Sequence, residues 1–437
     1  MTNEQRKEHY MNRNIKLIPT YLALTWDVIF VWTISIMFFT EQKGLSYAQT
    51  IALDSILMLV GCCFCLLFGK IFNKISPLKA SRYANFGYMA YLILCIIGTN
   101  YFTFVCAQFF LAFGYSLNAI KSNLILTESL HLVKRDKDYE RVYGKSFTIL
   151  YILDAIGAIF ITYVYDWNAY ASYWIAFGFA VFAFFYSFLL KNPRKFQESN
   201  ISINSKQETP KTKQVKSEGY FKILASTFVL SLMLYAFMFR GVIAVDMSMF
   251  KIYLQDKISI GTLPLWSFGF IYAGARLCVA VASKYQFKYN LKFGVRSILI
   301  FNVLLVGTYA INALLFILMP NSIVSLILII VLSYIQIALR IPNQIFLNNY
   351  MQVCVSKRNI EKAYAIRSTV EYLGYALMTF VYSALLTLCD NDYGKVGIIY
   401  ISIFALPLIA SMIFFVRQLC KKYAQKYTII KDEYTKD

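Results

Sequence analysis

Histidine is nearly absent from this sequence, and with it a common means of proton transfer and metal binding in enzymes. The 437 residues include 2 histidines, His9 and His131, which lie far apart in the sequence. The sequence motifs of a serine hydrolase, a zinc protease and a phosphate-binding glycine loop are absent as well. These absences argue against a hydrolase and against a nucleotide-driven pump. We expect no enzymatic activity, no cofactor and no metal site.

Charged residues are also scarce. They make up 15% of the chain, and hydrophobic residues make up 59%, whereas a soluble domain has about 25% charged residues. This composition excludes an ordinary soluble protein and is typical of an integral membrane protein. The first apolar stretch lacks a small-residue cleavage site, so we interpret it as a retained span rather than a signal peptide.

Twelve long apolar stretches are present, and most are near the length of about 20 residues that a membrane-spanning helix needs. The stretches cover residues 16–39, 47–69, 83–98, 102–127, 146–165, 169–190, 223–249, 262–283, 297–318, 321–349, 365–388 and 396–416. The sequence therefore predicts an all-α integral membrane protein with twelve transmembrane helices.

The 43 Lys and Arg residues are distributed unevenly around these stretches. Thirty-five lie at the chain ends or in every second gap, four lie in the alternate gaps, and four lie inside the stretches. Positive charge near the ends of spans stays on the cytoplasmic side, so both termini are predicted to be cytoplasmic. The net charge of +20 then reflects topology in the cytoplasmic (plasma) membrane. We expect the lipid bilayer as a partner and no nucleic acid.

The chain divides into two parts that resemble each other. Residues 41–43 (Glu-Gln-Lys) precede the second apolar stretch, and 214 residues later residues 255–257 (Gln-Asp-Lys) precede the eighth. Such nearly constant spacing predicts an internal repeat of two six-helix bundles. The predicted units are an N-terminal bundle at 1–191, a polar cytoplasmic linker at 192–220, a C-terminal bundle at 221–417 and a cytoplasmic tail at 418–437.

Ionisable residues inside the apolar stretches follow a pattern. Burying such a group in a membrane costs at least about 2.5–3.5 kcal/mol, so it should face the protein interior or water. The third, sixth, ninth and twelfth stretches contain none, and we expect these four to face lipid while the other eight surround a polar path. The intramembrane groups are Asp27, Asp54, Lys121, Asp154, Arg240, Asp246, Arg276, Arg340 and Glu371.

The segment after the second stretch carries a local motif. It has Gly69, then Asn73 and Lys74, then Ser76 and Lys79. In this spacing and in its overall architecture, the chain resembles the major facilitator superfamily of secondary transporters, with Asn73 in place of an acid and Ser76 in place of a second glycine. The resemblance implies two six-helix repeats, and it implies a cytoplasmic gate at Gly69, Asn73, Lys74 and Lys79.

The same resemblance implies a central cavity lined by the first, fourth, seventh and tenth helices. Lys121, Arg276 and Arg340 are at similar predicted depth, where they would form a positive patch suited to a carboxylate or phosphate. Pro342 is expected to break its helix and Gly241 to loosen its own. The candidate substrate-binding residues are Asp27, Asn118, Lys121, Ser122, Arg240, Arg276, Arg340, Asn343 and Gln344.

Three carboxylates are candidates for coupling transport to protons. Asp27 and Asp154 are predicted near the membrane midplane and Glu371 in its cytoplasmic half, where a carboxylate can take up a proton from one side and release it to the other. Permanent pairing of Asp27 with a cation such as Arg240 is the competing interpretation, because it would hold Asp27 ionised and give it a structural role.

The sequence therefore predicts a monomeric secondary transporter that moves a small polar or anionic organic solute by alternating access. Proton coupling, as symport or antiport, is expected. An alternative is multidrug or antibiotic efflux, which a cavity dominated by aromatic side chains and one carboxylate would favour. A non-transporting membrane sensor or scaffold is the alternative from another class, because transporter architecture does not by itself establish transport.

Overall fold

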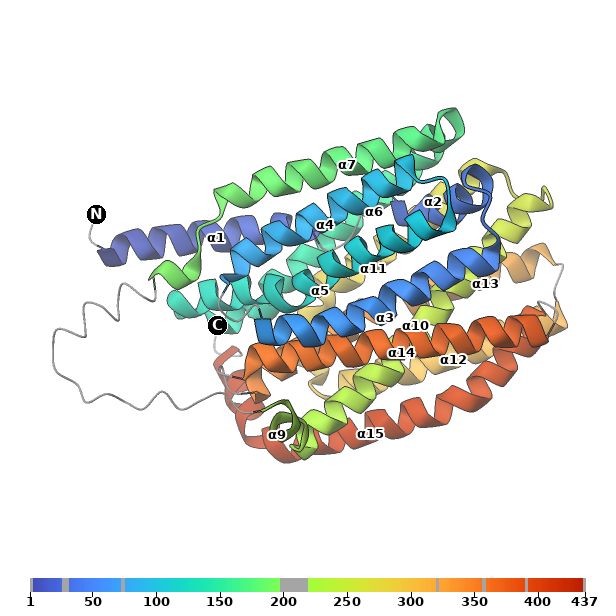
Figure 1. The fold of residues 1–437 in the computed structure, drawn as a ribbon. Coiled ribbons are helices and arrows are strands. Elements are labelled where there is room, and N and C mark those ends of the chain that lie inside the picture. The colour runs from blue at the N-terminus through green and yellow to red at the C-terminus, as the bar shows by residue number, and fades with distance from the viewer. Residues whose placement is uncertain are drawn as a thin grey trace.

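Helices account for all the regular structure in the part of the chain that the computed structural model describes (Figure 1). The all-α part of the predicted fold class is confirmed. The described residues are 3–25, 31–71, 75–196, 219–319, 322–355, 359–389 and 392–434.

The N-terminal half of the chain contributes α1 to α7. Its helices are α1 (Asn3–Thr25), α2 (Val31–Met37), the π-helical turn η1 (Phe38–Gln42), α3 (Tyr47–Ile71), α4 (Pro77–Ile97), α5 (Tyr101–Leu132), α6 (Tyr139–Trp167) and α7 (Ala169–Tyr186). The C-terminal half contributes α9 (Tyr220–Leu224), α10 (Thr227–Ser259), α11 (Leu265–Phe293), α12 (Arg296–Leu318), α13 (Ile323–Cys354), α14 (Ile360–Leu388) and α15 (Tyr393–Tyr434).

Ten helices in the described part of the chain are long and apolar enough to cross a membrane. They correspond to ten of the twelve predicted spans. The remaining two predicted spans coincide with α4, which is 21 residues long, and with α1 and α2, between which residues 26–30 lie outside the described residues. A membrane protein is therefore supported, and the count of twelve stays a prediction.

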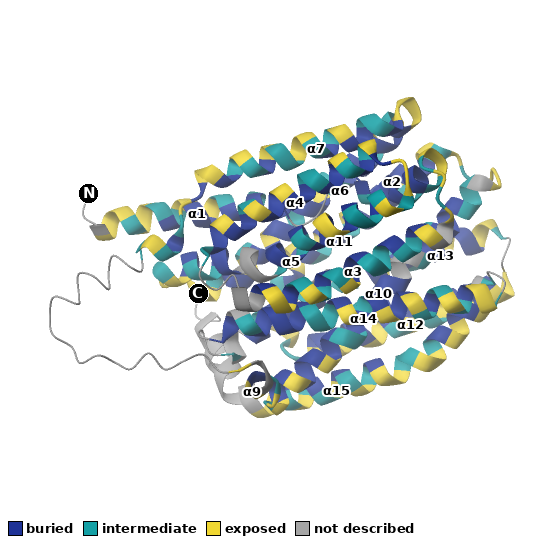
Figure 2. Ribbon diagram, in the orientation of Figure 1, coloured by how far each residue is buried: buried dark blue, intermediate teal, exposed yellow. Residues whose placement is uncertain are grey.

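The exterior of the bundle is apolar. Phe185 on α7 is 63% exposed and Leu406 on α15 is 73% exposed. Figure 2 shows exposed residues along these outer helices and buried ones where helices face each other. Large apolar side chains on an outer surface fit contact with lipid, in which only helices with internally satisfied backbones are stable.

Helix starts are set by local sequence. The Asn100 side chain accepts a hydrogen bond from the Thr103 backbone N–H at 2.9 Å and so caps α5. Asn168 caps α7 in the same way, and Ser76 with Pro77 starts α4. These residues satisfy backbone donors that the first turn of a helix leaves without partners.

The packing of α1–α7 is repeated by α10–α15. In the N-terminal half α1 packs on α5 and α6, and α4 packs on α5 and α7. In the C-terminal half α10 packs on α13 and α14, and α12 packs on α13 and α15. The halves meet where α6 lies along α11 and α3 along α14, the second of which is visible in Figure 1.

Two helices are more regular than the sequence predicts. Helix α13 continues through Pro342, and α10 continues through Gly241. The role of Gly241 is close packing, because a Cβ at this position would lie 2.3 Å from the Met378 Cγ and 2.9 Å from the Gly374 carbonyl oxygen of α14. The break expected at Pro342 was therefore wrong, and Gly241 lies within a continuous helix.

The predicted linker and tail can be compared with the structure only in part. Residues 197–218 of the predicted linker lie outside the described residues. Residues 418–434 of the predicted tail continue helix α15.

Candidate functional site

A cavity of about 180 Å³ lies between the two halves. Its described lining comes from α2, α3, α5 and α6 on one side and from α10, α11, α13 and α14 on the other. No described lining residue comes from α4, α7, α12 or α15, which are the four helices whose spans were expected to lack charge and face lipid.

The cavity wall carries an excess of positive charge. Five basic and three acidic side chains line it, so the described lining has two surplus positive charges. All five basic residues belong to the C-terminal half, and two of the three acidic residues belong to the N-terminal half. The charged lining residues are Arg240, Lys251, Arg276, Arg340 and Arg367, with Asp54, Asp154 and Glu371.

Two ion pairs neutralise part of this charge. Arg276 of α11 pairs with Asp154 of α6, with Nε 2.7 Å from Oδ2 and both side chains largely buried. This pair joins the two halves. Arg367 pairs with Glu371 one turn along α14, with Nε 2.6 Å from Oε1. Because both pairs are buried, removing one partner would leave an uncompensated charge.

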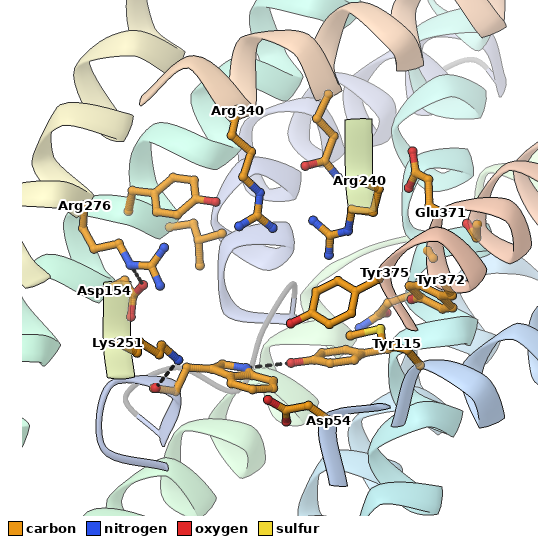
Figure 3. A pocket seen from close by; sticks show the side chains of 18 of the residues that line it. Asp54, Tyr115, Asp154, Arg240, Lys251, Arg276, Arg340, Glu371, Tyr372 and Tyr375 are labelled. Carbon is orange, nitrogen blue, oxygen red and sulfur yellow. Dashed lines mark hydrogen bonds and ion pairs between the residues drawn. The ribbon is translucent and has the colours of Figure 1, made fainter. Parts of the chain in front are cut away.

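Two of the three remaining basic residues, Arg240 and Arg340, lie at one end of the cavity. Figure 3 shows the guanidinium groups of Arg240 and Arg340 pointing toward each other across the cavity. Arg240 takes part in neither ion pair, and its Cζ lies 5.5 Å from the centre of the Tyr375 ring. Arg240 and Arg276 are positively charged neighbours of Arg340. Two guanidinium groups directed into one space can bind a carboxylate or phosphate through several charge-assisted hydrogen bonds.

Lys251 lies at the other end of the cavity. Its ammonium donates a hydrogen bond to the Trp32 carbonyl oxygen at 2.8 Å, which connects α10 to α2. Asp54 is a charged neighbour of Lys251 and takes part in neither ion pair. Figure 3 shows Asp54 at a distance from the guanidinium groups of Arg240 and Arg340.

Beyond the cavity, at the end of the bundle where α6 begins, an amide cluster joins the two halves. It consists of Glu140 of α6 with Gln286 and Asn290 of α11 and Asn349 of α13. The Asn290 amide donates to both carboxylate oxygens at 3.0 and 2.9 Å, the Asn349 amide donates at 2.9 Å, and the Gln286 amide also donates. Glu140 is 6% exposed.

This cluster adjoins the floor of the cavity. Asn348, next to Asn349 on α13, lines the cavity and donates to the Tyr143 hydroxyl at 3.1 Å. The oxygen of the same amide accepts a hydrogen bond from Arg367. A continuous set of polar contacts therefore runs from the Arg367–Glu371 pair through Asn348 to Tyr143 of the N-terminal half.

Several predicted binding residues do line the cavity. Arg240, Arg276, Arg340 and Gln344 face it, and so do the predicted coupling residues Asp154 and Glu371. The last two are held by the ion pairs described above, which gives them a structural role in this conformation. The four-residue spacing of Arg340 and Gln344 places both on the same face of α13, as the sequence predicted.

Two predicted binding residues have other roles. Asn118 touches the cavity, but its amide donates to the Thr25 carbonyl at 2.6 Å and to the Tyr88 hydroxyl at 2.7 Å. It therefore joins helices within the N-terminal half. Asn343 does not line the cavity, because it faces α10 and α12, where it accepts a hydrogen bond from the Tyr235 hydroxyl at 3.3 Å. The cavity therefore gives no support to its assignment as a binding residue.

Other predicted residues fall outside the described part. Asp27 is outside the described residues, and the side chains of Lys121 and Ser122 on α5 are also not described. Of the predicted gate, Gly69 belongs to α3, Asn73 and Lys74 lie outside the described residues, and Lys79 is exposed at the start of α4. The described contacts between the two halves at this end of the bundle include those of the amide cluster.

Sequence reasoning counted Lys251 and Arg367 only among the basic residues that mark the gaps between apolar stretches, whereas they belong to α10 and α14 and line the cavity. A helical signal was present for both. Lys251 follows Arg240 by 11 residues, which is close to three turns and returns to the same face. Arg367 precedes Glu371 by one turn. Glu140 was missed because it lies in a basic segment interpreted only as a topology signal.

Neither a protein-family model nor a curated protein matches this chain. The chemistry of the cavity and of the contacts between the halves is therefore the basis for assigning a function.

Proposed function

We propose that this protein is a secondary transporter of the major facilitator type that moves a small organic anion across the cytoplasmic membrane. The observation that carries the proposal is the cavity between the halves, with two surplus positive charges on its described lining and with Arg240 and Arg340 directed into it. A buried excess of like charge is unfavourable, and a bound anion would offset it.

The helix arrangement supports twelve spans in two six-helix repeats. The packing partners of α1 and α4 in the N-terminal half correspond to those of α10 and α12 in the C-terminal half. The start of α1 and the end of α15 lie at the same end of the bundle in Figure 1, which fits an even number of crossings. We propose that this is the cytoplasmic end, as the distribution of Lys and Arg predicts.

Alternating access requires contacts between the halves that form and break. We propose that the amide cluster around Glu140 closes the cytoplasmic end of the cavity in this conformation, since it joins α6 to α11 and α13. Opening that end would expose Glu140 and its three amide partners to water, which can replace their hydrogen bonds. This makes the cluster reversible in a way that an apolar contact is not.

Proton coupling remains part of the proposal. Asp154 and Glu371 are ion-paired, so among the described carboxylates Asp54 is the cavity residue that takes part in neither pair. Asp27 retains its sequence-based candidacy. Replacing either residue by Asn should abolish uphill transport driven by a pH gradient while leaving exchange. Unchanged accumulation in both variants would remove the two residues from the coupling step.

Multidrug efflux is the second candidate, because seven aromatic side chains line the cavity. The surplus positive charge argues against the lipophilic cations that such exporters often carry. A non-transporting sensor or scaffold would leave the cavity without a transported ligand.

The test is thermal stabilisation of the purified protein by organic anions, sugars, nucleosides, amino acids and cationic drugs, followed by uptake into proteoliposomes. A ligand that binds the folded state raises its apparent stability. The proposal expects stabilisation and uptake for an anion, with both lost in Arg340→Ala. Stabilisation by lipophilic cations alone would favour efflux, and anion binding without uptake would favour a sensor.

A further inference from the structure

Two aromatic side chains of the cavity, Trp32 and Tyr115, are held in position by their neighbours. Trp32 donates a hydrogen bond to the Tyr115 hydroxyl at 2.8 Å, and the two rings are nearly parallel, with an interplanar angle of 12° and centroids 6.5 Å apart. Tyr88 packs edge-on against Tyr115 with centroids 5.6 Å apart. Each ring thus has its position set by a neighbour before any ligand binds, which lowers the entropic cost of binding against it.

These rings lie beside the cations. Tyr375 lies under Arg240, and the Tyr272 ring centre is 4.7 Å from the Arg276 Cζ and 5.7 Å from the Lys251 Nζ. In Figure 3 the Tyr375 ring lies between Arg240 and Tyr115. A ligand whose acidic group reaches Arg240 would therefore extend along aromatic surface.

The neutral polar side chains of the lining suit a hydroxyl-rich ligand poorly. The amides of Asn118 and Asn348 are used in bonds to protein groups, and the Thr50 hydroxyl donates to a backbone carbonyl at 3.1 Å. Gln344 and Ser368 are the other neutral polar residues of the described lining besides the tyrosines. A sugar acid would lose more hydrogen bonds to water than these groups replace.

We propose that the transported anion carries a flat aromatic or heteroaromatic ring, with its carboxylate or phosphate at Arg240 and Arg340 and its ring packed between Tyr375 and the Trp32–Tyr115 pair. This inference rests on the proposed function and names its substrate class. Offset and edge-on ring contacts are favourable beyond simple burial. The ring should raise affinity at least about tenfold over a ring-free anion of equal charge.

The experiment is calorimetric binding to the purified full-length protein with anions matched in charge. Indole-3-acetate and 4-hydroxyphenylacetate carry a flat ring, cyclohexanecarboxylate carries a ring that is not flat, and gluconate and lactate carry hydroxyl groups. The expected result is that the two aromatic acids bind at least about tenfold more tightly than the other three. Equal or tighter binding of gluconate or lactate overturns the inference and keeps the proposed function. Failure of every anion to bind contradicts the proposed function itself.

A variant pair locates the ring. Tyr375→Leu should lower affinity for indole-3-acetate about tenfold and leave that for cyclohexanecarboxylate unchanged, whereas Tyr375→Phe should retain both. Tyr163→Leu, the same change at an exposed position of α6 outside the cavity, is the matched control. Equal losses for both acids in Tyr375→Leu would overturn the placement. If that variant does not fold, the ligand series on the unmodified protein still decides the matter.

Discussion

The two halves of this protein repeat the same helix packing but differ in the chemistry that they bring to the cavity. The C-terminal half supplies all five basic residues of the described lining, and the N-terminal half supplies two acids and no basic residue. The Trp32–Tyr115 pair also belongs to the N-terminal half, whereas Arg240 and Arg340 belong to the C-terminal half. Two halves with the same fold can therefore contribute different residues to the site. Their packing depends on apolar faces, whereas ligand binding depends on a few polar positions.

The difference in charge also holds the halves together. Arg276 and Asp154 form the one described ion pair of the cavity that crosses between them. The amide cluster crosses at one end, and the hydrogen bond from Lys251 to Trp32 crosses toward the other. Polar contacts between the halves can exchange with water, and so they suit a protein whose halves move relative to each other.

The largest expected effect comes from breaking the ion pair between the halves. Arg276→Ala leaves Asp154 buried without a partner, and Asp154→Ala does the same to Arg276, so each should destabilise the protein by about 3–5 kcal/mol. Denaturant unfolding in detergent measures this. The double variant Arg276→Ala/Asp154→Ala should be less destabilised than the sum of the two single changes. Strict additivity would show that the pair does not couple the halves.

Arg240 tests the cationic contribution of the C-terminal half. Removing a charge-assisted contact costs about 1.5–3 kcal/mol, so Arg240→Ala should weaken anion binding about 10- to 150-fold. Arg240→Lys keeps the charge but loses the planar fork of donors, and it should restore binding only in part. Calorimetric titration with the best-binding anion checks both. Full affinity in Arg240→Ala would place the anion elsewhere in the cavity.

Glu140 tests the contact that we propose closes the cytoplasmic end. Glu140→Ala leaves three amides without their acceptor, which should destabilise the closed conformation by about 1–3 kcal/mol. Labelling of a cysteine introduced beside the cluster, such as Tyr143→Cys, should become faster in the Glu140→Ala background.

Lys79→Ala is the matched control for Glu140, because this exposed residue begins α4 at the same end of the bundle. It should leave labelling unchanged. If labelling became faster in Lys79→Ala but kept its rate in Glu140→Ala, the result would favour the gate that the sequence motif implied.

The smallest expected effect on anion affinity comes from Asp54, the acid of the N-terminal half that takes part in neither ion pair. Asp54→Asn removes a negative charge from the cavity and should strengthen anion binding by about twofold to tenfold, since charges interact over several ångströms in a site of intermediate dielectric constant. The decisive observation is that Asp54→Asn changes anion affinity in the opposite direction to Arg240→Ala. Weaker binding in Asp54→Asn would mean that Asp54 contacts the ligand through a donor group of that ligand.

Much of the cavity was accessible from spacing in the sequence. Arg340 and Gln344 share a helix face, and so do Arg240 and Lys251, because the α-helix repeats every 3.6 residues. Lys251 was nonetheless counted only as a charge in the gap between the stretches 223–249 and 262–283. Asn343 was assigned to the cavity as a polar residue of the tenth span, although it is adjacent to Gln344 and adjacent residues of a helix point about 100° apart.

The sequence alone determined that the protein is helical and apolar, which helices carry buried charge, and which lack it. Hydropathy and charge are properties of each segment, and they need no knowledge of its neighbours. Tertiary structure alone decided that Asp154 pairs with Arg276, that Glu140 meets three amides of the other half, and that Asn343 faces away. These contacts join residues far apart in the chain, and their partners are selected by how whole helices pack.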